Sequence, residues 1–345
     1  MLTPPERSGI LAGGNWIVDR TKIIDVYPAQ DALANILQET SSNGGSPYNL
    51  LIDLARLQAP FHLEAVGLVG EDEAGDFIRA DCRAHGIDTR QLYTCEEAST
   101  SYTDVMTVQS TGRRTFFHHR GTNAFLEVEH FDFTQSRARI FHLGYLLLLD
   151  RLDQPNPEHG TAGAALLANA QSAGFKTSVD VVSEDSDRFA QIIRPALRYC
   201  DYCFLNEFEA ERTTGIQIVH SDTVDLNAAR IAASQLLKAG VREWVVIHFP
   251  VGTVAVGAKG DELTQGSVNV PQAKVAGTVG AGDAFAAGVL LGLHEQVPME
   301  LALKYGVCTA AASLSDPTTS RGVKPLSECL QYGAAFGFRK TQFES

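Results

Sequence analysis

The chain has 345 residues, of which 44% are hydrophobic, and its formal net charge at pH 7 is −13. This length is enough for one large α/β domain or two smaller ones, with a substantial core. The acidic balance argues against a nucleic-acid or membrane-surface binder, because both of those partners are polyanions. The sequence shows neither a secretory leader pattern nor an apolar run of about 18 residues, so we expect a cytoplasmic protein.

Strand and helix patterns alternate through most of the chain. In chain order, we expect a helix at 49–57, a strand at 63–69, a helix at 73–85, strands at 140–149 and 177–182 around a helix at 161–173, a helix at 224–239 and a strand at 244–248. Elements that alternate in this way form a mostly parallel sheet covered by helices on both faces. The sequence therefore predicts an α/β fold.

Two stretches lack helical periodicity. Residues 8–27 and about 91–120 contain short strand patterns and turn residues, and the strand patterns at 101–109 and 115–119 are joined at Ser110-Thr111-Gly112. This arrangement is typical of a β-hairpin. We expect a small, discontinuous β-sheet lid at about 14–43 and 91–123, within a single domain that spans residues 1–345.

The most informative motif is the run Thr278-Val279-Gly280-Ala281-Gly282-Asp283-Ala284-Phe285, which is followed by small and apolar residues. The small residues let backbone N–H groups approach a ligand, and the start of a buried helix attracts anions. A carboxylate beside such an anion site can accept a proton from a hydroxyl group that attacks phosphorus. The motif indicates a phosphotransferase, unless Asp283 only caps the helix.

Polar residues near the N-terminus are candidates for binding hydroxyl groups. Gly44 and Gly45 precede the first helix and allow close approach, and Asn49 offers an amide, although a capped loop would show the same pattern. Asn15 and Asp19 share one face if this stretch is an alternating strand. They would then chelate neighbouring hydroxyl groups or be solvated.

Asn206 and Glu209 follow a strand pattern at 202–205, at the edge where α/β proteins bind ligands. They lie on one face of the next helix and could hold a hydrated Mg²⁺. An N-terminal cap with acidic residues near the helix dipole is the alternative.

Cationic side chains concentrate on the proposed lid. This patch consists of Arg113, Arg114, His118, His119 and Arg120. Arginine recognises phosphate or carboxylate through its forked donors, whereas a solvated hairpin tip is the alternative for Arg113 and Arg114.

Together these motifs resemble the ribokinase-like (PfkB) family of carbohydrate and nucleoside kinases, over nearly the whole chain. The run 278–283 matches the C-terminal signature of the family, residues 44–49 with 66–75 match the N-terminal signature, and Asn206 with Glu209 matches the Asn-x-x-Glu motif. The resemblance implies a Rossmann-like, mostly parallel sheet between helices and a β lid that closes over a sugar and often forms a dimer interface.

The resemblance also implies roles for single residues. Asp283 would be the general base, and the backbone N–H groups of Gly280, Ala281 and Gly282 would form an anion hole. The candidates for binding the sugar are Asn15, Asp19, Gly44, Gly45, Asn49 and Arg120. The candidates for binding ATP are Asn206, Gly252 and Thr278, with Glu209 acting on Mg²⁺ through water.

The sequence departs from the family pattern in three places. Gly277 stands where the C-terminal signature usually begins with Asp, which puts the monovalent-cation site in doubt. His248-Phe249-Pro250 replaces the usual Thr-x-Gly, so a nucleotide contact is altered. The lid carries more Arg and His than a pentose site requires, which permits a substrate with a carboxylate or phosphate.

We therefore expect ATP-dependent phosphorylation of a sugar hydroxyl group. An adenosine- or inosine-type nucleoside kinase is the alternative, and a non-catalytic sugar or nucleotide sensor is a second alternative. The expected partners are a small sugar and ATP, without nucleic acid or a membrane, and the resemblance allows a homodimer through the lid.

Overall fold

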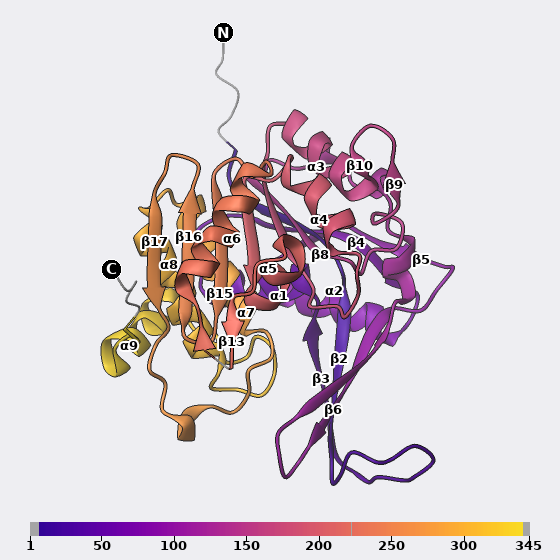
Figure 1. Cartoon of the computed structure of the whole chain (residues 1–345). Helices are drawn as coiled ribbons and strands as arrows, with labels where there is room; N and C mark the ends of the chain where they lie inside the picture. The colour runs from indigo at the N-terminus through magenta and orange to yellow at the C-terminus, as the bar shows by residue number, and fades with distance from the viewer. Residues whose placement is uncertain (1–6, 222, 341–345) are drawn as a thin grey trace.

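The computed structural model of the protein describes residues 7–221 and 223–340. In this part of the chain, a nine-stranded sheet forms the centre of the molecule (Figure 1). The strand order is β17 (Glu262–Gly266), β16 (Gly252–Gly257), β15 (Trp244–Phe249), β12 (Tyr202–Asn206), β11 (Lys176–Val181), β8 (Ile140–Leu146), β1 (Ile10–Gly14), β4 (Leu63–Gly70) and β5 (Asp88–Cys95). Neighbours from β15 to β5 are parallel, and β16 and β17 add antiparallel strands at one edge. The predicted mostly parallel α/β sheet is confirmed.

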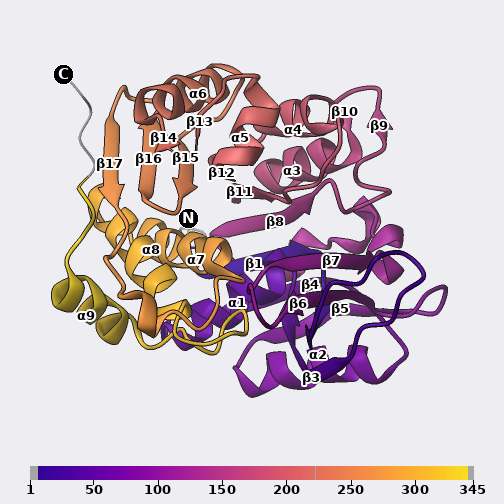
Figure 2. The same cartoon turned by 60° about the horizontal axis from the view of Figure 1, so that its bottom comes forward.

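Helices cover both faces of this sheet (Figure 2). One face carries α3 (Ala162–Ser172), α4 (Phe189–Leu197), α5 (Glu207–Thr214) and α6 (Leu226–Lys238). The other carries α1 (Ser46–Arg56), α2 (Glu73–Ala84), α7 (Ala281–His294) and α8 (Met299–Ser313), with α9 (Leu326–Phe336) packed against α8. Within the described residues, no helix is long and apolar enough to cross a lipid bilayer.

The central strands are apolar on both sides because each side faces a hydrophobic core. In β1, Ile10 and Ala12 pack into the core under α1 and α7, while Leu11 packs into the core under α3 and α4. Successive side chains of a strand point to opposite faces, so burial on both faces requires an almost continuous apolar run. This packing holds the carboxyl ends of the strands in fixed positions.

A second sheet projects from the large domain (Figure 1). Among the described residues it has four strands, in the order β3 (Ile36–Gly44), β2 (Ile17–Ile24), β6 (Ser101–Val108) and β7 (Arg114–His119). We call this sheet the lid. Its two antiparallel pairs are joined by parallel pairing of β2 with β6, and the predicted hairpin is present as β6 and β7.

Several predicted boundaries differ from the observed ones, and two of these differences concern the edge of the lid and the end of β8. Residues 91–95 were expected in the lid, but they belong to β5, which pairs with β4 and extends the large sheet. The sequence did not separate them because no helix lies between β5 and β6. The strand expected at 140–149 ends at Leu146, because Leu147 adopts a left-handed conformation with φ of 79°.

Two very short hairpins complete the described fold, β9 (Pro155–Asn156) with β10 (Gly160–Thr161) and β13 (Val219–His220) with β14 (Thr223–Val224). The first lies in the connection from β8 to α3, and the second in the connection from α5 to α6.

Candidate active site

Two adjoining cavities lie at the carboxyl ends of the parallel strands, and the lid faces the larger one. The larger cavity, about 700 Å³, is lined by lid residues, by the ends of β11 and β12 and by the start of α7. The smaller cavity, about 470 Å³, lies between the end of β15 and helices α7 and α8. The two cavities share His248, Thr278, Ala281 and Gly282. They form a continuous site whose centre is the glycine-rich run.

The glycine-rich run forms a tight turn into α7. Gly280 has a φ of 72°, and an added Cβ there would lie 2.7 Å from the carbonyl oxygen of Thr319, so a glycine is required. Among the described residues, no side chain caps this helix. Its first residues, Ala281 and Gly282, line both cavities, so helix N–H groups without a capping side chain lie at the shared part, as an anion site requires.

Asp283 is the third residue of α7, and its carboxylate lines the larger cavity. It does not cap the helix. It accepts hydrogen bonds from the Tyr145 hydroxyl at 2.6 Å and from the Asn49 side-chain nitrogen at 2.8 Å. Burial raises the pKa of Asp283 to about 6, while these two hydrogen bonds oppose the rise. A carboxyl group with a pKa near neutrality suits a general base.

Four further carboxyl groups line the same cavity, those of Asp19, Asp180, Glu184 and Glu209. Burial and the charge of Asp283 raise the pKa of Asp19 to about 7, and the same two causes raise the pKa of Asp180 well above its usual range. Burial also raises the pKa of Glu209 to about 8. Burial, with added repulsion between like charges, thus favours the protonated form of Asp19, Asp180 and Glu209. This environment favours ligands that bring hydroxyl donors or cations.

The N-terminal signature residues come together at the larger cavity. Asp19, Gly45 and Asn49 line it, while Gly44 lies directly beneath Asp19. An added Cβ at Gly44 would lie 2.5 Å from the carboxyl carbon of Asp19, and one at Gly45 would lie 2.1 Å from the carbonyl oxygen of Asn15. The paired glycines thus let β3 pass close to the cavity wall. Four of the predicted sugar-binding residues are grouped around Asp283.

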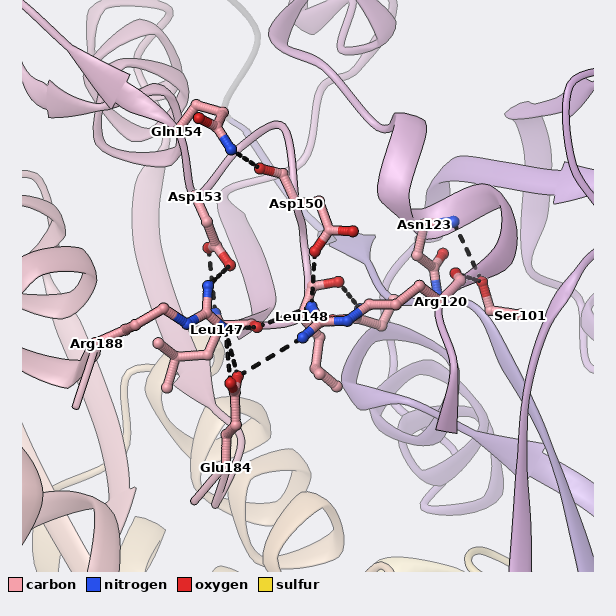
Figure 3. A network of polar contacts seen from close by, with 11 residues as sticks. Ser101, Arg120, Asn123, Leu147, Leu148, Asp150, Asp153, Gln154, Glu184 and Arg188 are labelled. Carbon is pink, nitrogen blue, oxygen red and sulfur yellow. Dashed lines mark hydrogen bonds and ion pairs between the residues drawn. The ribbon is translucent and has the colours of Figure 1, made fainter. Parts of the chain in front are cut away.

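Asn15 and Arg120 were expected to touch the substrate, but neither lines the cavity. The Asn15 side chain is buried between β1 and β2, where its Nδ2 donates to the carbonyl oxygen of Leu148 at 3.3 Å. The Arg120 guanidinium donates to the carbonyl oxygen of Leu147 at 3.0 Å and pairs with Asp150 at 2.9 Å (Figure 3). Local acceptors therefore take the donors that the sequence appeared to offer to a ligand.

Asn206 and Glu209 form a capping box at the start of α5. The Asn206 side chain accepts from the Glu209 backbone N–H at 2.9 Å, and the Glu209 carboxylate accepts from the Asn206 backbone N–H at 2.9 Å. Ser183 also donates to Glu209 at 2.8 Å. The capping alternative is therefore observed, yet both residues also line the larger cavity.

The chemistry around Glu209 fits a hydrated magnesium ion. Across residues 7–221 and 223–340, no cluster of three or more His, Cys, Asp or Glu side chains is arranged to ligate a metal directly. A cation at this position would therefore depend on water and phosphate oxygens, which Mg²⁺ commonly uses. Glu209 lines the larger cavity, and its carboxylate accepts from Ser183 and from the backbone and side chain of Asn206, which leaves acceptor capacity for such a water molecule.

The smaller cavity has an apolar interior and a polar end. Its apolar lining includes Val268, Val270, Val275, Val307 and Leu314, and Gly252 also lines it. His248 lies at the polar end against the ring of Phe285, at 5.2 Å between centroids. Burial lowers the pKa of His248 to about 4, so the imidazole is neutral at pH 7. Its replacement of the usual threonine leaves a hydrogen-bonding group beside Gly282.

Gly277 packs directly on the loop after α8. An added Cβ would lie 2.8 Å from the Cα of Pro317, so the backbone here leaves no room for the aspartate of the family pattern. The doubt about a monovalent-cation site at this position stays a prediction.

Sequence reasoning missed the cavity residues Tyr145 and Asp180, and it named Arg114 and His118 only as members of the cationic patch on the lid. Asp180 stands between Val179 and Val181 in a buried strand, and this isolated acid was a usable signal. Arg114 had been left open as a solvated tip, but it donates to the Thr278 hydroxyl at 2.7 Å across the gap between lid and large domain. His118 donates to or accepts from Thr103 at 3.0 Å through Nδ1.

The model of the pfkB family carbohydrate kinases matches residues 15–327. The chain belongs to this family, as the motifs predicted.

Individual relatives span almost the whole protein. The chain is 28% identical over 328 residues to an ATP-dependent ribose-1-phosphate kinase of Halopiger xanaduensis, which covers 92% of this chain and 98% of the relative. It is 24% identical over 301 residues to adenosine kinase 2 of Arabidopsis thaliana, covering 85% of this chain and 83% of the relative. The structure of Arabidopsis thaliana ribokinase complexed with ribose and ATP has a TM-score of 0.75 at 20% identity, covering 95% of this chain and 98% of that one.

These findings define the class of enzyme. The protein is a phosphotransferase that uses an alcohol group as acceptor, and it is a sugar or nucleoside kinase of the ribokinase family. The ribokinase-like fold and the kinase class predicted from the motifs are confirmed. The non-catalytic sensor is set aside.

Proposed function

We propose that the protein transfers the γ-phosphoryl group of ATP to a hydroxyl group of a sugar bound in the larger cavity. The observation that carries this proposal is the position of Asp283, whose buried carboxylate lines the larger cavity beside the glycine-rich turn shared with the smaller one. ATP would occupy the smaller cavity, with its base among the valines and its phosphates at the shared residues. The hydroxyl group and the phosphorus atom would then meet beside Asp283.

The residues around this point divide the chemical work. Asp283 takes the proton of the attacking hydroxyl group, and Tyr145 and Asn49 hold its carboxylate in one orientation. The backbone N–H groups of Gly280 to Gly282 meet the negative charge that develops on the phosphoryl oxygens. Asp19 and Asp180 accept hydrogen bonds from other hydroxyl groups of the sugar. The chemistry requires no covalent intermediate on the protein.

The nucleotide phosphates carry Mg²⁺ in most kinases, and here the ion would neutralise part of their charge when bound. Glu209 and Asn206 would hold it through water molecules, since their side chains face the cavity and already fix each other. Binding of a cation would favour the ionised form of Glu209, against the effect of burial.

Arg114 supplies positive charge from the lid. Its guanidinium is half-buried, and no described acidic side chain lies close enough to it, within 4.0 Å, to form an ion pair. Every other charged side chain that lines the larger cavity is acidic. Its hydrogen bond to Thr278 holds it beside the turn that precedes the anion hole. This position supports a contact with the transferring phosphoryl group, made only when the lid is closed.

A nucleoside acceptor is the second candidate, because the larger cavity also has an apolar wall. Phe116, Leu148 and Val182 contribute to this wall, and a nucleobase would cover them better than a free pentose. Release of ADP should therefore be compared with ribose, ribose 1-phosphate, fructose, 2-keto-3-deoxygluconate, adenosine and inosine as acceptors. Turnover with a sugar is the expected result, turnover with nucleosides alone would establish the alternative, and no turnover with any alcohol would contradict both.

We also propose that two copies associate through the lid. Its outer strands and the loop between β2 and β3 expose several large apolar side chains, Val26, Tyr27, Leu33, Ile36, Leu37 and Phe117. Leu33 is 82% exposed, which is unusual for a leucine close to other apolar residues. A second lid would cover these side chains with matching apolar surface.

A further inference from the structure

Residues 145–148 bring two side chains to the larger cavity. Tyr145, near the end of β8, donates its hydroxyl to Asp283 at 2.6 Å, and Leu148 forms part of the apolar wall. Between them, Leu147 is fully buried with a φ of 79°. Residues other than glycine rarely adopt this conformation, so neighbouring groups must hold it.

Three side chains hold Leu147 by its backbone (Figure 3). Its carbonyl oxygen accepts hydrogen bonds from Arg120 at 3.0 Å and from Arg188 at 2.9 Å. Its N–H donates to the carboxylate of Asp153 at 3.2 Å. We call Arg120, Asp153 and Arg188 the Leu147 clamp. Both peptide groups of the residue are fixed in this way, although the residue itself has an unfavourable conformation.

Acidic neighbours keep the two guanidinium groups of the clamp side by side. Glu184 accepts from Arg188 at 2.8 Å and lies 3.8 Å from Arg120, while Asp150 pairs with Arg120 at 2.9 Å. Without these carboxylates the two cations would repel each other across one carbonyl oxygen. Glu184 also lines the larger cavity, so the clamp extends to the cavity wall.

The clamp and its surroundings also connect residues 145–148 to the lid. Arg120 directly follows β7, the last strand of the lid. Asn15 lies in the connection from β1 to the first lid strand, and it accepts from the Tyr145 backbone N–H and donates to Leu148 at 3.3 Å. Two of the connections between the lid and the large domain therefore contact the segment that carries Tyr145.

We propose that Arg120, Asp153 and Arg188 are positioning residues that fix the orientation of Tyr145 toward Asp283, and that Arg120 and Asn15 make this orientation depend on the lid. The inference rests on the proposed function, since the orientation of Tyr145 matters for turnover only if Asp283 is the base. It also gives a role to Asn15 and Arg120, neither of which touches the substrate cavity.

The test is a double-mutant cycle between Arg188→Ala and Tyr145→Phe. Loss of the clamp should lower kcat about 10- to 100-fold by misplacing Tyr145, with little change in KM for ATP. In the Tyr145→Phe background, Arg188→Ala should have almost no further effect, because the group that it positions is gone. Losses that multiply in the double variant would overturn the proposal.

A second readout does not depend on turnover. The pKa of the Asp283 carboxyl group can be followed by NMR titration, with Asp283→Asn to assign the signal. The described ionisable groups that face it are Asp19, Asp53, Tyr145, Asp180 and Glu209. Arg188→Ala should raise this pKa, because a hydrogen bond that favours the carboxylate is weakened, and Tyr145→Phe should raise it too. An unchanged pKa in folded Arg188→Ala would overturn the proposal.

Matched variants separate positioning from general stability. Arg230, on the distant helix α6, forms an ion pair with Glu262 at 2.9 Å, so Arg230→Ala also removes an arginine ion pair. This variant should leave kcat and the pKa of Asp283 unchanged. If circular dichroism shows that Arg188→Ala does not fold, Arg120→Gln replaces it in the double-mutant cycle with Tyr145→Phe and in the NMR titration, with the same expected results. Normal turnover of Asp283→Asn would show that Asp283 is not the base. Because the NMR titration needs no catalysis, it would still show whether the Leu147 clamp fixes the orientation of Tyr145, so the two failures are distinguishable.

Discussion

The large domain and the lid form opposite walls of one cavity, and they contribute different ionisable side chains to it. The large domain supplies buried carboxyl groups, Asp180 near the end of β11 and Asp283 at the start of α7, from elements whose apolar residues pack into a hydrophobic core. The lid has no comparable core and supplies Asp19 from β2 together with Arg114 and His118 from β7, so it provides the cationic side chain of the cavity. Burial shifts pKa values on both walls, while closure over a ligand needs a part with few fixed contacts. The difference indicates that reactivity belongs to the large domain and that the lid controls access and charge.

The largest effect should come from the wall that holds the reacting groups. Asp283→Asn keeps the shape of the side chain but removes the proton acceptor, so kcat should fall roughly 10²–10⁴-fold with the affinities for sugar and ATP nearly unchanged. Steady-state kinetics and calorimetric titration measure both quantities. Asp19→Asn is the matched control in the lid, and it should raise KM for the sugar more than it lowers kcat. Equal losses of kcat in Asp283→Asn and Asp19→Asn would contradict the proposal that the large domain carries the reactive group.

A smaller effect is expected from the cation of the lid. Arg114→Gln should lower kcat about 10²-fold, the size found for loss of one donor to a developing charge, because the phosphoryl group loses its contact from the closed lid. Arg113→Gln is the control, because Arg113 is the exposed neighbour of Arg114 and does not line the cavity. This variant should behave as the wild type. A defect confined to KM for acidic sugars would instead assign Arg114 to an anionic group of the substrate.

The smallest effect on catalysis is expected on the outer surface of the lid. Leu33→Ser with Leu37→Ser should convert dimers to monomers in sedimentation velocity, because both side chains are at least half exposed in a single copy. Turnover should change by only about threefold, since neither residue reaches the cavity. Ile231→Ser, which removes an exposed isoleucine from α6, should leave the assembly unchanged. A wild-type protein that sediments as a monomer would contradict this prediction.

The elements of the large domain could be predicted because periodicity reports burial locally. The pattern from Glu73 to the Gly86 turn, for example, predicted α2 with its end wrong by one residue. Leu147 could not be predicted, since its conformation depends on arginines 27 and 41 residues away in the chain. Local propensity carries no information about such distant partners.

The same limit applies to the candidate site. The signatures located Asp283, Asn49 and Gly45 correctly at the cavity, because glycine requirements and helix starts are encoded in short runs. Asn15 and Arg120 do not line the cavity, and backbone carbonyl groups of residues 147 and 148 accept hydrogen bonds from their side chains. Tyr145 gave no signal, since a tyrosine at the end of an apolar strand is equally suited to packing.

The central claim is that ionisation of Asp283 controls phosphoryl transfer, and the pH dependence of the single-turnover rate tests it most directly. The wild-type rate should be lost as the pH falls through about 6, because the protonated carboxyl group cannot accept the hydroxyl proton, and it should level off above that value. Asp283→Asn should be slow throughout and lack this acid limb. The same acid limb in Asp283→Asn would contradict the account and assign the titrating base to another carboxyl group of the cavity.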